Sequence, residues 1–142
     1  MAFARDILAS KGTEVHCLGP DDKVLEALKL MASQNVGSVI ITEGDAVIGI
    51  FTERKYAREV FLKGRAAPNT PIRDVMETEV LSVSPDDSVE TCMAMMSDRR
   101  IRHLPVIKEG RLEGIISIGD LMKSIIDARE FDIDQLVKYV RS

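Results

Sequence analysis

The 142-residue sequence predicts an α+β fold built from two consecutive β-α-β-β-α repeats. The first observation is self-similarity, because a shift of 65 residues superposes Pro20-Asp21-Asp22 on Pro85-Asp86-Asp87 and Gly49-Ile50 on Gly114-Ile115. The second is that short apolar runs alternate, in each half, with segments whose apolar residues recur at helical spacing. This pattern favours sheets covered by helices on one side.

Each half begins with a short apolar strand, and the sequence Pro-Asp-Asp that follows it can cap a helix. After the helix come two strands joined by a tight glycine-containing turn, and the second strand leads into another helix. The predicted strands span residues 15–18, 36–42 and 46–51 in the first half and residues 80–83, 101–107 and 112–116 in the second. The residues at helical spacing are Leu25, Leu28, Met31 and Ala32 in the first half and Val89, Met93 and Met96 in the second.

The two halves are joined by residues 63–71, where glycine, asparagine and two prolines predict a linker. We therefore expect a first domain of residues 1–65, with an N-terminal helix, and a second domain of residues 66–142, with the linker and a C-terminal helix. The C-terminal helix is expected to be amphipathic. Its apolar face is formed by Ile133, Leu136, Val137 and Val140.

Composition narrows the class of protein. A hydrophobic content of 45% with 30% charged residues is ordinary for a globular protein. The net charge of −4 disfavours nucleic-acid binding. Two cysteines predict no disulfide scaffold and fit a reducing cytosol. With neither a signal peptide nor an apolar run near the ~18 residues of a membrane span, we expect a cytoplasmic protein outside the membrane.

A short motif closes each repeat. In Gly114-Ile115-Ile116-Ser117-Ile118-Gly119-Asp120, a strand ends at a hydroxyl and a carboxylate follows in the first turn of a helix. Ser117 and Asp120 at this spacing resemble a capping box. A carboxylate also suits a vicinal diol, because its two oxygens accept two hydrogen bonds together. The motif alone leaves both interpretations open.

These features together resemble a tandem pair of cystathionine-β-synthase-type (CBS) domains over essentially the whole chain. The resemblance rests on the repeat, on Arg102-His103-Leu104-Pro105-Val106, and on the Gly-apolar-apolar-Ser/Thr-x-x-Asp ending of each half. It implies two sheets packed face to face with pseudo-two-fold symmetry. It further implies a homodimer and a non-catalytic regulatory module that binds an adenine nucleotide (AMP, ADP, ATP or NAD) in clefts between the repeats.

The resemblance implies an adenosine site in the second half. There Asp120 would accept hydrogen bonds from the ribose hydroxyls, with Ser117 nearby. The strand segments of the second half would line the same site. The implied ligand-binding residues are Ser82, Ser84, Arg102, His103, Leu104, Pro105, Ser117 and Asp120.

The first half departs from this pattern, because Thr52 is retained but Lys55 replaces the acid. A lysine has three donors and no acceptor, and positive charge is unfavourable at a helix N-terminus. We hypothesise that Arg54, Lys55 and Arg58 face the phosphates of a nucleotide, with Thr52 and Ser38 lining the same first cleft. The alternative is an exposed basic surface whose side-chain stems cover apolar neighbours.

Two other function classes remain open. One is a small nucleotide-acting enzyme with His103 or Cys17 as base or nucleophile, although nothing in the sequence pairs either with an orienting group. The other is an interaction protein that binds no ligand and dimerises through the helices at residues 28–31 and 93–96. His16, Cys17 and Cys92 lack a metal-binding spacing, so no metal and no catalytic cofactor is expected. The regulated protein is not identified by the sequence.

Overall fold

A computed structural model describes residues 2–141 and divides the chain into two compact units. The first-repeat unit comprises Glu14–Leu81 and Lys108–Leu112. The second-repeat unit comprises the residues up to Thr13, Ser82–Ile107 and the residues from Glu113 onward. The units are therefore interleaved along the chain, and the predicted division between residues 65 and 66 stays a prediction.

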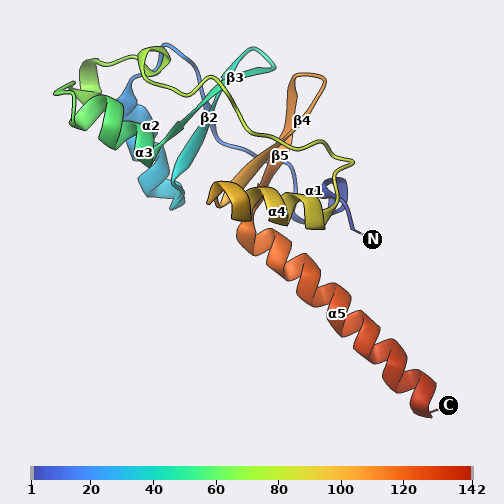
Figure 1. Cartoon of the computed structure of the whole chain (residues 1–142). Coiled ribbons are helices and arrows are strands. Elements are labelled where there is room, and N and C mark those ends of the chain that lie inside the picture. Colours follow the sequence, from blue (N-terminus) through green and yellow to red (C-terminus); the bar gives the residue numbers. More distant parts are fainter. Residues whose placement is uncertain (1, 142) are drawn as a thin grey trace. The chain divides into compact units, whose positions relative to one another are not determined.

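The first-repeat unit contains one complete β-α-β-β-α repeat (Figure 1). Strand β2 pairs in parallel with β1 and antiparallel with β3, and Gly44 (φ 62°) lies in the tight turn between β2 and β3. A short α-helix after β3 continues as a π-helix, Tyr56–Phe61. The elements are β1 (Cys17–Leu18), α2 (Val24–Gln34), β2 (Ser38–Glu43), β3 (Ala46–Thr52) and α3 (Glu53–Lys55).

The core of this unit follows from the helical and strand periodicities. Helix α2 buries residues three and four positions apart against the apolar side chains of β2 and β3, and Phe51 is fully buried. The 3₁₀ helix Ile72–Asp74 contributes Ile72, and Val75, which follows this helix directly, is also buried. The core consists of Val24, Ala27, Met31, Val39, Ile41, Phe51, Val60, Ile72 and Val75.

The second-repeat unit is built in the same way and includes the N-terminal helix (Figure 1). Helices α1 and α4 both pack against α5. The turn between β4 and β5, whose residues belong to the first-repeat unit, has positive φ at Glu109 (53°) and Gly110 (79°), as hairpin turns of this length require. The elements are α1 (Ala4–Lys11), α4 (Val89–Arg99), β4 (His103–Lys108), β5 (Arg111–Ser117) and α5 (Ile118–Arg141).

The segment that precedes each repeat in the sequence packs into the unit of the other repeat. A Cβ atom placed on Gly114 would lie 2.6 Å from Leu8 Cδ2, so the glycine lets α1 approach β5 closely. In the first-repeat unit, a Cβ on Gly49 would lie 2.6 Å from Met76 Sδ and 3.0 Å from the Glu77 carbonyl oxygen. The two repeats therefore use equivalent glycines for equivalent contacts.

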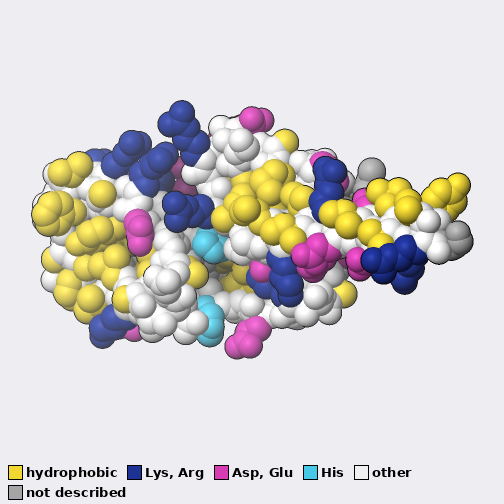
Figure 2. Space-filling model, turned by 90° about the horizontal axis from the view of Figure 1, so that it is seen from below, with side chains coloured by type: hydrophobic (Ala, Val, Ile, Leu, Met, Phe, Trp, Pro, Cys, Tyr) yellow, Lys and Arg dark blue, Asp and Glu magenta, His cyan; other side chains and the backbone are white. Residues whose placement is uncertain are grey.

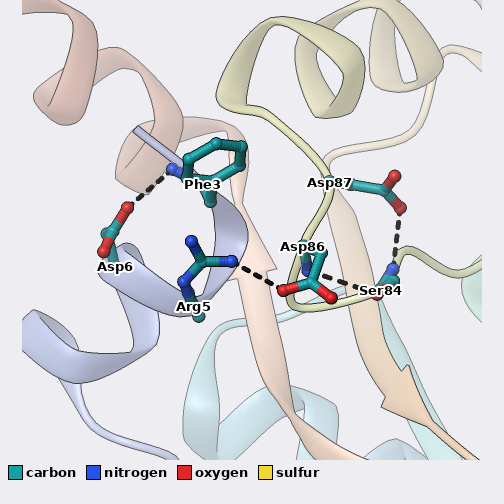
Figure 3. A network of polar contacts seen from close by, with 6 residues as sticks. All are labelled: Phe3, Arg5, Asp6, Ser84, Asp86 and Asp87. Atoms are coloured by element: carbon teal, nitrogen blue, oxygen red, sulfur yellow. Dashed lines mark hydrogen bonds and ion pairs between the residues drawn. The ribbon is translucent and has the colours of Figure 1, made fainter. Parts of the chain in front are cut away.

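The same equivalence holds for an ion pair in each unit. Arg5 Nη1 lies 2.6 Å from Asp86 Oδ1, and Arg5 stacks over the Phe3 ring at 4.5 Å from its centroid (Figure 3). In the first-repeat unit, Arg73 Nε lies 2.8 Å from Asp21 Oδ1. The hydrogen bond and charge of Arg73 hold the pKa of the Asp21 carboxyl below its ordinary value.

Two predictions about the start of each repeat were wrong. The Pro-Asp-Asp aspartates do not cap the helices. Asp22 accepts a hydrogen bond from the preceding Gly19 N–H at 2.8 Å, and Asp87 accepts one from the preceding Ser84 N–H, also at 2.8 Å (Figure 3). Ser88 instead caps α4 by accepting from Thr91 N–H. The first strands are also shorter than predicted: β1 has two residues, and residues 80–83 form only one bridge, Val83 to Val106, before the aspartate-closed turn begins.

The predicted C-terminal helix is present, but it is not separate from the helix of the second repeat. Helix α5 runs without interruption for 24 residues from Ile118 to Arg141. No helix within residues 2–141 combines the length and apolar composition needed to cross a membrane.

Candidate functional site

The motif at the end of the second repeat forms a reciprocal cap at the start of α5. Ser117 Oγ accepts a hydrogen bond from the Asp120 N–H at 3.1 Å. Asp120 Oδ2 in turn accepts from the Ser117 N–H at 2.8 Å. The capping function considered for this motif is therefore present. It fixes the carboxylate where β5 ends and α5 begins.

Lys11 joins this cap from α1. Its Nζ lies 2.6 Å from Asp120 Oδ2 and donates to the Ile115 carbonyl oxygen at 2.9 Å. The side chains of Lys11 and Asp120 are 33% and 24% exposed, so solvent or a ligand can still reach the pair. Within residues 2–141, every hydrogen bond to the Asp120 carboxylate falls on Oδ2. Asp120 Oδ1 therefore remains able to accept a further hydrogen bond.

Two neighbouring groups have shifted pKa values. Burial raises the pKa of the Asp120 carboxyl, but hydrogen bonds from Lys11 and Ser117 and the charge of Lys11 outweigh it, so the net pKa lies below the ordinary value. Burial, followed by the charge of Lys11, lowers the pKa of His103, and Asp120 only partly offsets this. The site thus pairs a carboxylate with an uncharged imidazole at neutral pH.

The lowered pKa of Asp120 predicts an acid-sensitive contribution to stability. Because the folded-state pKa lies below the unfolded value near 3.8, this contribution is complete above that value and is lost as pH falls through the folded-state pKa. We expect Asp120→Asn to lower the free energy of unfolding at neutral pH. The difference in this free energy between wild type and variant should shrink as the pH falls. Urea unfolding of both proteins over a pH series measures the difference, and a difference that stays constant in acid would contradict the assignment.

The strand that contains His103 is tied directly to this cap. Arg102 O accepts a hydrogen bond from the Ile118 N–H at 2.9 Å, which joins the start of β4 to the start of α5. The Arg102 side chain is exposed and His103 is half-buried. Leu104 is fully buried in the core and Pro105 is also buried, so these two could present only backbone to a ligand.

The two predicted serines lie differently. Val83 lies beside β4 in parallel, donating to Pro105 O and accepting from Ile107 N–H. Parallel pairing places Ser82 toward the beginning of β4, where His103 lies, and Ser84 toward its end. Ser84 Oγ also accepts from the Asp86 N–H at 3.2 Å in the turn near Arg5 (Figure 3). By this register Ser82 lies nearer than Ser84 to the beginning of β4, which is hydrogen-bonded to the start of α5.

The first repeat reproduces this backbone arrangement with different side chains. Thr52 Oγ1 accepts from the Lys55 N–H at 3.1 Å, as Ser117 does from Asp120. Ser38 pairs with Thr52 across β2 and β3, which brings these two predicted residues together. Gly37 O accepts from the Glu53 N–H at 3.1 Å, the counterpart of the bond from Ile118 to Arg102.

The ion pair at the helix start of the first repeat has its two charges exchanged relative to the pair of Lys11 and Asp120 in the second repeat. Lys55 Nζ lies 3.3 Å from Glu77 Oε2, so the cation belongs to the helix start and the carboxylate to the segment preceding the other repeat. The Glu79 N–H, followed by Lys55, lowers the pKa of Glu77. Arg54 and Arg58 are exposed and form no ion pair within residues 2–141. An ion-pair partner therefore accounts for Lys55, whereas Arg54 and Arg58 remain open to an anion.

Sequence reasoning did not find Lys11 or Glu77. The only available signal was the shifted match between the leading segments, where Arg5-Asp6-Ile7-Leu8 aligns with Arg73-Asp74-Val75-Met76. That match shows that the leading segments are equivalent, but not that each one packs with the other repeat.

Metal ligands and reactive cysteines are two further kinds of chemical site. Within residues 2–141, no three His, Cys, Asp or Glu side chains are placed to hold a metal ion. Cys17 and Cys92 are free, and burial raises the pKa of both thiols. Neither cysteine is therefore activated as a nucleophile.

Comparisons with known proteins match both repeats. A family model described as "CBS domain" matches residues 4–61 and 72–127. The CBS domain-containing protein CBSX3, mitochondrial, of Arabidopsis thaliana is 34% identical, and the match covers 96% of this chain and 70% of that protein.

Two solved structures extend the comparison. A provisionally named signal-transduction protein with CBS domains from Burkholderia ambifaria MC40-6 is 41% identical with a TM-score of 0.80, over 89% of this chain and 95% of that one. A hexameric CBS-CP12 protein from bloom-forming cyanobacteria is 27% identical with a TM-score of 0.68, over 84% of this chain and 66% of that one.

Proposed function

The chain belongs to the CBS-domain family, and from that premise we propose that it is a non-catalytic regulatory module that senses an adenine nucleotide. The observation that carries the proposal is the Asp120 carboxylate, fixed by Ser117 and Lys11 with Oδ1 open to a further donor. A ribose diol provides two such donors, and a carboxylate held in place loses little freedom on accepting them. We assign the half-buried His103, whose pKa is lowered by burial and by the charge of Lys11, to contact with the base.

The two repeats are unequal in this proposal. The second repeat supplies the acceptor that an adenosine requires, whereas the first offers Thr52 and Ser38 with cations and no acid. Because Lys55 is already paired with Glu77, Arg54 and Arg58 carry most of any phosphate contact. The second repeat is therefore the better adenosine site.

Binding can be coupled to a structural change through Lys11. A diol that engages both oxygens of Asp120 competes with the Lys11 ammonium for Oδ2, and Lys11 lies at the end of α1. A ligand shifts an equilibrium only as far as it prefers one arrangement over another. Here the two arrangements differ in α1, which is held at Asp120 by Lys11 in one and loosened in the other. A partner protein, which the chain itself does not identify, would respond to it.

In this proposal the chain carries out no reaction of its own. His103 is the one histidine at the site, and its charged neighbours are Lys11, Asp120 and Arg102, with no nucleophile among them. A small nucleotide-acting enzyme therefore has no observation in its favour. A cytoplasmic location and a homodimer remain predictions. The hexameric CBS-CP12 protein is a relative that self-associates, which supports oligomerisation of this chain.

A thermal-shift screen tests the function directly. AMP, ADP, ATP and NAD are compared with GMP and inorganic phosphate, and a ligand at 100 times its Kd should raise Tm by roughly 5–10 °C. A shift confined to adenine ligands supports the proposal. The absence of a shift with every adenine nucleotide, or an equal shift with GMP, would contradict it.

The phosphate role in the first repeat makes a separate prediction. Arg54→Ala with Arg58→Ala is expected to weaken ATP binding roughly five- to tenfold while leaving adenosine binding unchanged, because exposed charge contacts are individually small. Calorimetric titration of both ligands measures this. Arg65→Ala is the control, since Arg65 is an exposed arginine of the same unit that donates to Glu59 O. Unchanged ATP affinity would show that Arg54 and Arg58 do not contact phosphate.

A further inference from the structure

The C-terminal part of α5 is not covered by any other element of its unit. Leu121 is the only buried residue in the 24-residue helix, and every described residue from Ile126 onward is exposed. Helices α1 and α4 pack only against its beginning, and the rest extends away from them (Figure 1).

This uncovered part carries an apolar stripe of five residues, which run from Met122 to Val140 and which we call the α5 stripe. Its five members are 52%, 52%, 58%, 65% and 80% exposed, and Figure 2 shows apolar side chains gathered along this segment. They fall at alternating a and d positions of a heptad repeat, with Arg129 at the one remaining d position. In order, the members are Met122, Ile126, Ile133, Leu136 and Val140.

We propose that the α5 stripe pairs with the α5 stripe of a second copy of this chain, as a short parallel coiled coil in register. The a positions Ile126, Ile133 and Val140 are all β-branched, and the d positions include Met122 and Leu136. Branched residues at a with leucine at d favour two parallel strands. The sequence of the stripe therefore favours a parallel pair of two such helices.

Charge supports a copy over a lipid surface. Arg129 at d is followed by Glu130 at e, and in a parallel pair the d residue of one helix packs beside the e residue of the other. Each Arg129 would therefore contact a Glu130 of the second copy. Residues 122–141 carry four acidic and four basic side chains, so this segment lacks the net positive charge that attracts anionic lipid.

The buried area fits a modest, concentration-dependent contact. At roughly 100 Å² for each apolar side chain, two α5 stripes bury roughly 1,000 Å², which is near the lower limit for specific interfaces. The contact therefore suits a helix that pairs as part of a larger assembly.

Cysteine cross-linking of the full chain tests the pairing. In a Cys17→Ser background, Leu136→Cys places thiols at facing d positions, within the Cα separation that a disulfide tolerates. Asp134→Cys is the control, because it lies on the outer face of the same turn. Under a glutathione redox buffer we expect a disulfide-linked dimer from Leu136→Cys, at least tenfold above that from Asp134→Cys. Equal yields from both variants, or none from either, would overturn the proposal.

A second measurement separates the possible occupants of the stripe. Leu136→Glu should raise the dimer dissociation constant at least tenfold in sedimentation equilibrium. Phe131→Glu, which alters a 63% exposed side chain outside the stripe, should leave it unchanged. Binding to phosphatidylcholine–phosphatidylglycerol vesicles that is lost in Leu136→Glu, without cross-linking of Leu136→Cys, would assign the stripe to a lipid surface and overturn the pairing.

Discussion

Asp120→Asn is expected to weaken binding of the preferred adenine nucleotide by roughly 10- to 100-fold. The substitution keeps the shape of the side chain but removes the charge that would accept the ribose hydroxyls, and hydrogen bonds to charged groups contribute roughly 1.5–3 kcal/mol. The same substitution weakens the cap on α5 and the contact with Lys11. Affinity is therefore measured by calorimetry at a temperature where circular dichroism shows the variant to be folded.

Asp86→Asn is the matched control. Asp86 belongs to the same unit, pairs with Arg5 at 2.6 Å and lies in the turn before α4 (Figure 3), and none of its contacts within residues 2–141 involves Asp120. It loses the same charge without touching the proposed site, so nucleotide affinity should stay within a factor of two. An equal loss in both variants would show that the effect of Asp120 is structural or generally electrostatic.

The largest effect on stability is expected from Phe51→Ala. Phe51 is fully buried between α2 and the sheet of the first-repeat unit, and truncating such a side chain costs about 3–5 kcal/mol through lost burial and the cavity it leaves. Chemical denaturation followed by circular dichroism measures the loss.

Phe61→Ala provides the comparison for this prediction. Phe61 is an aromatic residue of the same unit but is 69% exposed, so its truncation should change the free energy of unfolding by less than about 0.5 kcal/mol. If the two substitutions cost the same, the packing described for the first-repeat unit is wrong.

Most of the secondary structure could be predicted because its signals are local. Helices α2 and α4 follow from apolar residues three and four positions apart, and both hairpins follow from strand-forming runs around Gly44 and Gly110. The family and the α+β fold, predicted from the repeat, are confirmed by matches over both repeats. The first strands were overestimated, because an apolar run does not reveal how many of its residues find a partner.

The candidate site was only half accessible to sequence reasoning. Ser117 and Asp120 are three residues apart, so their relation is fixed by local geometry and could be predicted. Lys11 reaches Asp120 across 109 positions of the chain, and only the packing of α1 into the second-repeat unit brings them together. The packing of the other leading segment into the first-repeat unit likewise explains why Lys55 is tolerated at a helix start, because it places Glu77 beside Lys55.

The most direct test of the central claim is made on the ligand. Calorimetry compares the strongest-binding nucleotide of the screen with its 2′,3′-dideoxy analogue, using wild type and Asp120→Asn. If Asp120 holds the ribose, wild type should bind the analogue at least tenfold more weakly, and Asp120→Asn should bind the two alike. Equal affinity of the wild-type protein for both ligands would contradict the claim.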